Sequence, residues 1–323
     1  MQHSVRVIPI ACSFGQTVAY VYYIDAPEPV LIDTGIAASP SQVIEPELKK
    51  HDVKLSDVRW ILLTHGHADH LGGIQEVWKK TGRNANVVIP QKDARLLRDR
   101  REHIKDHEHL QGPYLAPETK KKQQAILMDI IGGEVEPTHE VVSGDRLTFG
   151  GDVSVTVIST PGHSNGSVTY LLNEQNWAFA ADAVQMYGGE SSGLPTIENS
   201  ALYRQSVRHL LEEVRPERLY LGHHFLDANG NAVDARVDGE DVPNVLRASL
   251  EMDEKLAGIA QRHRIDEVHP DRAGDGLYEP FTAIARELEY TGDPRVLPSA
   301  FFVTMNGYRE ELTGVKKEGG KIQ

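Results

Sequence analysis

An α/β layered architecture with a mixed sheet is the fold class that this sequence of 323 residues predicts. Short apolar runs rich in β-branched and aromatic residues alternate with helical patterns through the first third of the chain. The run Trp60 to Leu63 is continuously apolar, as expected of a strand buried on both faces. Strand patterns return at Val153 to Ile158, Ser167 to Leu172 and Trp177 to Ala181, so both halves of the chain contribute strands.

The N-terminal elements follow from local signals. Thr17 to Ile24 and Val30 to Ile32 are separated by a proline-containing turn, which predicts a hairpin. Ser39 then supplies an N-cap, a proline occupies the first helical position, and Gln42 completes a capping box, so a helix is expected to run to about Lys50.

Later elements are predicted in the same way. A short helix carries Ile74, Val77 and Trp78 on one face, and a strand is expected at Val87 to Ile89. Residues from about 91 to 131 are strongly charged and helical in pattern, and they predict a helical insertion on the surface of the main fold.

The C-terminal half ends in helices. One helix and the strand Leu219 to Leu221 follow the returning strands, and a longer helical pattern begins near residue 239. The lysine- and glycine-rich end at 316–323 is expected to fray. We therefore divide the chain into a catalytic domain at 1–238 and a mostly helical extension at 239–323.

Composition limits the partners. The formal net charge is −13, with 47 acidic and 34 basic residues, so a phosphate backbone would be repelled and no nucleic-acid partner is expected. Cys12 is the only cysteine, which excludes an intramolecular disulfide. No segment approaches the roughly 18 apolar residues that a membrane helix needs, and no signal-peptide pattern is seen. We expect a soluble, cytoplasmic protein.

The densest functional signal is the segment Thr64 to His70, which directly follows a buried strand. His65 and His67 are two residues apart and point the same way in an extended backbone. Asp69 and His70 are adjacent, so they diverge and reach a second point. Imidazoles combined with a carboxylate suit zinc or a similar metal.

Three further residues, like the segment Thr64 to His70, follow an expected strand. His163, Asp182 and His223 each lie just beyond the end of an expected strand. A histidine or aspartate at one strand end is usually a cap or a surface residue. The repetition of this position makes a shared metal site the better interpretation.

Together these motifs resemble the metallo-β-lactamase superfamily. Its His-x-His-x-Asp-His motif, third histidine, bridging aspartate and last histidine correspond, in that order, to His65, His67, Asp69, His70, His163, Asp182 and His223. The segment Leu31 to Gly35 also matches an early Asp-Thr-Gly segment of the family, where Asp33 would support the ligand loop. The resemblance covers about residues 5–226 and implies an αβ/βα sandwich with a dinuclear site at one edge of two facing sheets.

The resemblance also implies which residues would bind each of the two metals. His65, His67 and His163 would hold one metal, Asp69, His70 and His223 the other, and Asp182 would bridge them. Two divalent ions are implied, with zinc expected and iron or manganese as alternatives. A hydroxide shared by the ions would be the nucleophile, and Asp69 would orient it or take its proton.

Subfamilies differ in ways that the sequence addresses. Flavodiiron members usually carry glutamate in place of His67, RNA-processing members fit poorly with the negative charge, and β-lactamases proper lack the last histidine of the motif. The remaining group hydrolyses carboxylic esters, lactones or thioesters, as glyoxalase II and the acyl-homoserine lactonases do. A mononuclear iron sulfur-dioxygenase and a phosphodiesterase or nuclease stay open as alternatives.

Neither branch of this group is matched completely. Lactonases place a tyrosine three residues beyond the bridging aspartate, where this chain has Gln185, with Tyr187 two residues further on. Glyoxalase II binds glutathione through basic residues of a C-terminal helical domain. Charged residues of the extension could act similarly, although a solvated face is the simpler expectation: Arg247, Lys255, Arg262 and Arg264.

Expectations for substrate contacts are less specific. Tyr187 and His224 are the candidate substrate-binding residues. The insertion, the segment 185–198 and the tail are expected to shape the pocket for a small-molecule substrate or a homodimer contact. Apolar candidates for the pocket are Tyr114, Leu115, Met186, Tyr187 and Leu194. The helical histidines His103, His107 and His109 are expected on a solvated face, and Cys12 as a small buried residue rather than a nucleophile.

Overall fold

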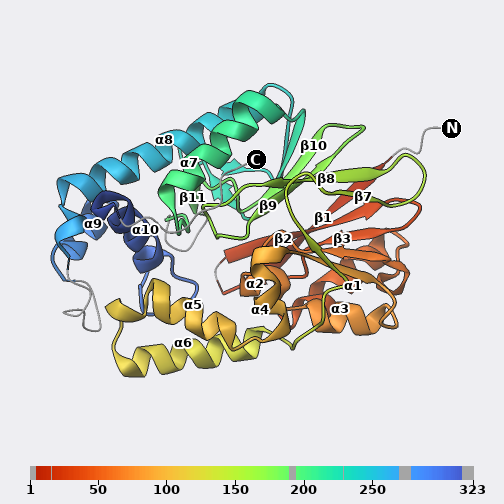
Figure 1. Cartoon of the computed structure of the whole chain (residues 1–323), viewed down its shortest axis with the longest axis horizontal. Coiled ribbons are helices and arrows are strands. Elements are labelled where there is room, and N and C mark those ends of the chain that lie inside the picture. The colour runs from red at the N-terminus through yellow and green to blue at the C-terminus, as the bar shows by residue number, and fades with distance from the viewer. Residues whose placement is uncertain (1–4, 16, 189–193, 228, 269–277, 315–323) are drawn as a thin grey trace.

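Two six-stranded mixed sheets face each other in the computed structural model, with helices on both outer faces (Figure 1). The structure describes residues 5–15, 17–188, 194–227, 229–268 and 278–314. The predicted αβ/βα sandwich is confirmed. The expected fraying at 316–323 lies outside the described residues.

The first sheet is built from the N-terminal strands in sequence order: β1 (Arg6–Phe14), β2 (Thr17–Asp25), β3 (Val30–Ile32), β4 (Trp60–Leu62), β5 (Asn86–Pro90) and β6 (His139–Val141). The first three strands are antiparallel, and β3 to β6 run parallel to one another. Because parallel strands end at the same edge, the loops after β3, β4 and β5 lie together.

The second sheet has the spatial order β15 (Arg236–Asp238), β12 (Arg218–Leu221), β10 (Trp177–Ala181), β9 (Val168–Leu172), β8 (Ser154–Ser159) and β7 (Arg146–Thr148). Only β10 and β12 are parallel neighbours in it. A third, small sheet contains β11 (Tyr187–Gly188), β13 (Phe225–Leu226) and β14 (Ala232–Val233).

The helices form two sets. The set nearest the first sheet comprises α1 (Glu45–Lys50), α2 (Ala68–Leu71), α3 (Ile74–Lys80), α4 (Ala94–Arg98), α5 (Glu102–Leu110) and α6 (Pro117–Ile130). The set on the second sheet comprises α7 (Ser200–His209), α8 (Asp241–Arg262), α9 (Phe281–Glu287) and α10 (Phe301–Thr313). Single-turn helical segments lie at Pro40–Ile44, Leu55–Asp57, Gln91–Asp93, Gly112–Tyr114, Leu210–Val214 and Ile265–Glu267.

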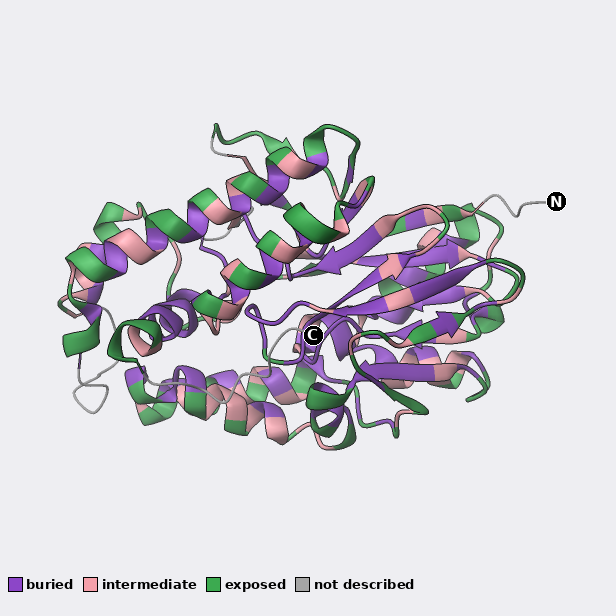
Figure 2. Cartoon of the chain, turned by 45° about the horizontal axis from the view of Figure 1, so that its top comes forward, coloured by how far each residue is buried: buried purple, intermediate pink, exposed green. Residues whose placement is uncertain are grey.

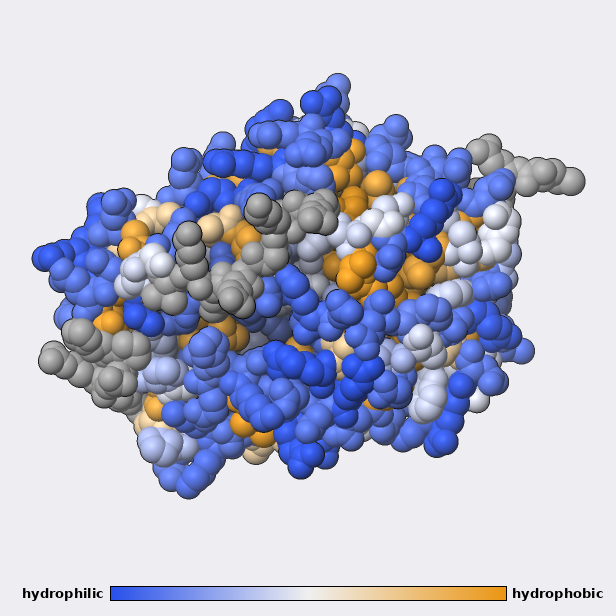
Figure 3. Space-filling model, viewed as in Figure 1, coloured by the Kyte–Doolittle hydropathy of each residue, from blue (hydrophilic) through white to orange (hydrophobic). Residues whose placement is uncertain are grey.

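Three apolar cores correspond to this layering. One lies between the sheets and joins Tyr22 and Leu62 of the first sheet to Tyr170 and Phe179 of the second. A second fills the space between the first sheet and its helices, and a third the space between the second sheet and α7–α10. The strands are mostly buried and the helices are buried on one side, so the outer surface is mainly hydrophilic (Figures 2 and 3).

The insertion and the extension are part of the packed structure. Leu97 and Leu127 of the insertion belong to the core of the first sheet. Tyr114 stacks on Phe302 of α10 with ring centroids 5.2 Å apart, and its hydroxyl donates to Oδ1 of Asn306. Helices predicted for 91–131 are present, and they contact the tail as well as the main fold.

Two local features differ from the sequence analysis. Strand β1, which contains Pro9, was not among the predicted strands; it is an edge strand of its sheet, where a proline is tolerated. Ser39 does not cap a helix: it has helical backbone angles, and its hydroxyl accepts from the backbone N–H of Ile36 instead. The helix nevertheless ends at Lys50 as predicted.

Within the described ranges, none of the helices is both long enough and apolar enough to cross a bilayer.

Candidate metal centre

The ligand loop begins where β4 ends and turns into the short helix α2. His65 and His70 are buried, while His67 and Asp69 are partly exposed. Gly66 allows the backbone of the ligand loop to pack closely against Leu96, because a Cβ at this position would lie 2.3 Å from Cδ1 of Leu96. The motif therefore sits on a rigid strand end with its four side chains directed to one edge of the sandwich.

The other candidate ligands come from the second sheet. His163 follows β8, Asp182 follows β10 and His223 follows β12. The pairing of β10 with β12 shifts register near Ala181, whose φ of 44° is unusual for a non-glycine residue, and this irregularity turns Asp182 toward the ligand loop. Gly222 leaves room for it, since a Cβ there would be 1.8 Å from Oδ1 of Asp182.

Three imidazoles converge in what we call the histidine group, His65, His67 and His163. Nε2 of His163 lies 3.1 Å from Nε2 of His65 and 2.8 Å from Nδ1 of His67. One atom from each side chain lies within 4.8 Å of the others, which is the spacing of ligands around a single ion.

A second cluster, the mixed group, contains Asp69, His70 and His223. Nε2 of His70 lies 3.4 Å from Nε2 of His223 and 3.8 Å from Oδ2 of Asp69. Asp182 lies between the two groups: its Oδ2 is 2.9 Å from Nε2 of His223 and 3.3 Å from Nε2 of His163. All seven side chains predicted as ligands are thus brought together by the fold.

Outer partners fix which nitrogen of each imidazole carries the proton. Asp33 accepts from Nδ1 of His70 at 2.9 Å. The backbone carbonyls of Thr196 and Val18 lie 2.8 and 2.9 Å from Nδ1 of His163 and His223. In each case the proton faces outward, so the lone pair of Nε2 faces the centre.

The same holds for the remaining two histidines. The Thr64 hydroxyl donates to Oδ2 of Asp33, so it can only accept from Nδ1 of His65, 3.1 Å away. Nε2 of His67 lies 3.2 Å from a carboxylate oxygen of Glu198, which leaves Nδ1 facing inward. The potential metal-binding nitrogen of each of the five imidazoles therefore faces the centre.

This arrangement fits bound cations. The facing nitrogens lie 2.8 to 3.4 Å apart, so their lone pairs repel one another unless a metal ion or a proton lies between them. Oδ1 of Asp182 is buried and has no hydrogen-bond partner among the residues that the structure describes, although buried polar atoms seldom lack one. A donor set of imidazole nitrogens and carboxylate oxygens is the set that zinc and related divalent metals take.

The pKa shifts differ from one histidine to another, and despite burial the pKa of His67 is raised by Glu198. Burial lowers the pKa of His163 to about 3 and holds that of His65 well below its usual range, so both are neutral and ready to act as ligands. At His70, burial is outweighed by the charges of Asp182, Asp69 and Asp33, which raise the pKa to about 10. A metal entering the mixed group would therefore displace a proton there.

Two supporting carboxylates were not predicted. Glu198 holds Nε2 of His67, and the buried Asp93 accepts from the backbone N–H of Gly66 at 2.7 Å. Burial raises the pKa of Asp93 to about 6. Asp93 follows the end of β5, the position that identified the other site residues, so it could have been found. Glu198 is 131 residues from His67 and has no such signal.

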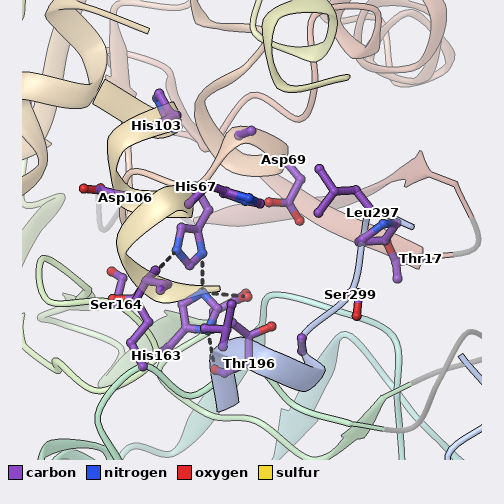
Figure 4. Close-up of a pocket in the computed structure, with 18 of the residues that line it drawn as sticks. Thr17, His67, Asp69, His103, Asp106, His163, Ser164, Thr196, Leu297 and Ser299 are labelled. Atoms are coloured by element: carbon purple, nitrogen blue, oxygen red, sulfur yellow. Dashed lines mark hydrogen bonds and ion pairs between the residues drawn. The ribbon is translucent and has the colours of Figure 1, made fainter. Parts of the chain in front are cut away.

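The centre opens into a cavity of about 760 Å³. Asp69, His163 and Asp182 lie in its wall, and Figure 4 shows Leu297, Thr17 and Ser299 on one side of them and His103 and Asp106 on another. The insertion, the segment 194–198 and the tail each contribute lining residues, as predicted.

Individual predictions for the cavity had mixed outcomes. His224 and Leu194 line it, whereas Tyr187 is not among the described lining residues and instead pairs through β11 with β13. Gln185 also lines it and donates to the backbone oxygen of Asp182 at 3.2 Å. Three other candidates are buried in the core of the second sheet: Tyr114, Leu115 and Met186.

The expected solvated face of α5 is present only in part. His109 is exposed and His107 is half-buried, but His103 is buried with its Nε2 3.1 Å from the backbone oxygen of Leu96. All three histidines line the cavity. The charge of α5 suggested exposure, but the tail packs over this helix. Cys12 is buried as expected, and burial raises its pKa to about 11.

Comparison with known proteins agrees with this geometry. A profile of the metallo-beta-lactamase superfamily matches residues 13–223. The chain is 31% identical over 166 residues to the protein YobT of Bacillus subtilis (strain 168), covering 50% of this chain and 60% of that protein. It is 24% identical over 189 residues to a hydroxyacylglutathione hydrolase of Methylobacillus flagellatus, covering 57% of this chain and 56% of the relative.

The chain thus spans about half to three fifths of the length of these relatives. Among solved structures, a metallo-beta-lactamase family protein from Thermus thermophilus superposes with a TM-score of 0.66 at 19% identity, covering 98% of this chain and 96% of the other. That likeness concerns the fold and includes the helical extension. The matched segment contains all seven converging side chains, and the chain belongs to the metallo-beta-lactamase superfamily.

Proposed function

We propose that the protein is a dinuclear metal-dependent hydrolase that cleaves a small, uncharged carboxylic ester, lactone or thioester. The observation that carries this proposal is the convergence of seven side chains with their lone pairs directed inward. The mixed group is complete, with Asp69, His70 and His223, and this supports two ions rather than the single iron of a sulfur-dioxygenase.

Two divalent ions bound there, with zinc as the expected metal, would supply a nucleophilic hydroxide near neutral pH and polarise the substrate carbonyl. The side chains of the protein would position the substrate and accept a proton. Asp69 lies in the cavity wall with a partly exposed side chain, so its carboxylate can meet the substrate. Its pKa is lowered, because the charges of His70 and His223 outweigh its burial, so it is ionised and can accept a proton.

The charge of the cavity favours an uncharged substrate. Arg95 is the only lysine or arginine among the described residues that line it. Its guanidinium is already paired with Asp106 at 2.6 Å and with Glu102 at 3.2 Å. The described lining therefore offers no unpaired lysine or arginine to a substrate carboxylate or phosphate, whereas Phe14, Val18 and Phe225 offer apolar surface near the metal ligands.

This separates the proposal from two alternatives. The basic residues of the extension that would serve glutathione do not line the cavity, and two of them are paired on the surface, Arg262 with Glu287 and Arg264 with Glu267. Arg98 of the insertion is likewise paired, with Glu136 and Glu140, and does not line the cavity. An acyl-glutathione thioester or a phosphodiester is thus less well accommodated.

A matched substrate panel tests the proposal. Zinc-replete protein is assayed with one acyl group carried by an alcohol ester, by the uncharged thiol N-acetylcysteamine and by glutathione, together with lactones and phosphodiesters. We expect the uncharged esters, thioesters or lactones to be cleaved, and Asp182→Asn to abolish this activity. Efficient cleavage of phosphodiesters alone, or of the glutathione thioester alone, would overturn the proposed substrate class.

A further inference from the structure

The segment from Pro195 to Glu198 links the C-terminal helix α10 to the metal centre. The backbone carbonyl of Thr196 accepts from Nδ1 of His163 at 2.8 Å, a contact drawn as a dashed line in Figure 4. Two residues later, the carboxylate of Glu198 meets Nε2 of His67 at 3.2 Å. One short stretch of chain therefore orients two of the three imidazoles in the histidine group.

Helix α10 holds this segment from behind. The hydroxyl of Thr304, which is fully buried, donates to the backbone oxygen of Pro195 at 2.6 Å and accepts from the backbone N–H of Ile197 at 3.1 Å. Both hydrogen-bonding functions of one side chain are thus used on two backbone groups that flank Thr196. A loop lacks the regular backbone hydrogen bonds of a helix or a sheet. Such side-chain contacts therefore determine where the carbonyl of Thr196 points.

Gly307, one turn further along α10, permits the close packing. A Cβ at this position would lie 2.6 Å from the backbone oxygen of Ile197 and 3.0 Å from that of Glu198. The front of the segment is fixed as well, because the backbone N–H of Glu198 donates to the oxygen of Gly162 at 2.9 Å. The segment is therefore clamped between α10 and the loop that carries His163.

By contrast, the mixed group has no contact of this kind among the described residues. His70 is supported by Asp33 and His223 by the backbone oxygen of Val18, both from the first sheet. The two metal positions thus share Asp33, which contacts His70 directly and reaches His65 through Thr64, but among the described residues only the histidine group is contacted by the segment that α10 holds.

We propose that α10 is a positioning element for one metal only: through Thr304 and the segment Pro195–Glu198 it sets the affinity of the histidine group, and it leaves the mixed group unaffected. Thr304 and Glu198 are positioning residues that act through His163 and His67. This inference rests on the proposed dinuclear centre and goes beyond it, because it assigns to the helical extension a role in metal occupancy.

Metal titration tests this inference without reference to turnover. Wild-type protein and Thr304→Val are freed of metal, titrated with Zn²⁺ against a competing chelator, and titrated separately with Co²⁺ while the visible absorption is recorded. We expect wild type to bind two ions and Thr304→Val to bind one of them about 10- to 100-fold more weakly, as is typical when an outer partner of a ligating histidine is lost. The second ion should keep its wild-type affinity.

Matched variants control for general damage. Thr304→Ser retains the hydroxyl and should restore both affinities. Thr313→Val makes the same substitution near the end of α10, where the hydroxyl donates to the backbone oxygens of Arg309 and Glu310 in its own helix, and it should titrate as wild type. Glu198→Ala should reproduce the selective loss, and Glu198→Gln, which keeps an acceptor for His67, should largely reverse it.

The outcomes separate the two ideas. If wild type binds fewer than two ions, the dinuclear proposal fails. If wild type binds two ions and Thr304→Val and Glu198→Ala bind both as tightly, the positioning role of α10 is overturned. Equal weakening of both ions in Glu198→Ala would also overturn it. Should Thr304→Val fail to fold, the pair Glu198→Ala and Glu198→Gln still decides.

Discussion

Oδ2 of Asp33 lies 2.9 Å from Nδ1 of His70 and 2.8 Å from the hydroxyl of Thr64, so one buried carboxylate supports the imidazoles of both metal groups. Thr64 transmits this support to His65. Asp33 has a φ of 62°, a conformation that costs free energy in a non-glycine residue and persists where the surroundings over-determine it.

Asp33→Asn should therefore weaken metal binding about 10- to 100-fold while the fold is retained, because asparagine tolerates the left-handed backbone but lacks the charge that orients His70. Elemental analysis after dialysis against a weak chelator measures this. Asp52→Asn is a matched control, since Asp52 is exposed and has a φ of 60°. Undiminished metal content in Asp33→Asn would show that the carboxylate is dispensable.

Asp69→Asn tests the proposed proton acceptor. An amide oxygen can still approach a metal, but it cannot take a proton, so we expect kcat/KM to fall about 10²- to 10⁴-fold in a variant that retains its metals. Steady-state kinetics on the best ester of the panel, with metal content measured on the same sample, provides the test. Near-normal turnover in the metal-replete variant would remove Asp69 from the mechanism.

Leu297→Lys tests the charge selectivity of the cavity. Leu297 lies in the wall, so a lysine there would add an unpaired ammonium group to the cavity. KM for an acyl-glutathione thioester should fall and KM for the uncharged ester should rise. Val296→Lys places the same charge on the neighbouring side chain, which is 57% exposed, and should change neither value. Identical effects of the two variants would point to long-range steering instead of contact in the cavity.

His103 should make the protein less stable in mild acid. Burial lowers its pKa to about 4 from an ordinary value of 6.5. Between these values the unfolded chain binds a proton that the folded protein refuses, so the free energy of unfolding decreases as the pH falls from about 6.5 to about 4. Denaturant titrations at several pH values, with equal metal present, should give a smaller decrease for His103→Gln, by up to about 1.4 kcal/mol per pH unit. A slope equal to that of wild type would contradict this.

The sequence was sufficient for the sandwich and for the ligand set because these signals are local. The motif from His65 to His70 is contiguous, and the remaining ligands each follow a strand with a clear apolar pattern. A parallel strand end is also a position that can be inferred without coordinates, since such ends meet at one edge of a sheet.

What could not be predicted depends on contacts distant in sequence. Glu198 is an isolated acidic residue in a loop, and its role arises only when the fold brings it to His67. His103 belongs to a helix whose charged sequence suggested exposure, whereas this helix packs against α4, α6 and α10 and the His103 side chain is buried. Thr304 could not be identified either, because in the sequence it resembles any other threonine in an apolar helix. Its two backbone partners become visible only in the folded protein.

The most direct test of the dinuclear hydrolase is activity measured as a function of bound metal. Metal-free protein is titrated with Zn²⁺, and the rate of cleavage of an uncharged ester or lactone is recorded with the number of ions bound per chain. The account predicts that activity rises until two ions are bound and then stays constant. Full activity with one iron per chain, oxygen consumption and no stimulation by zinc would contradict it.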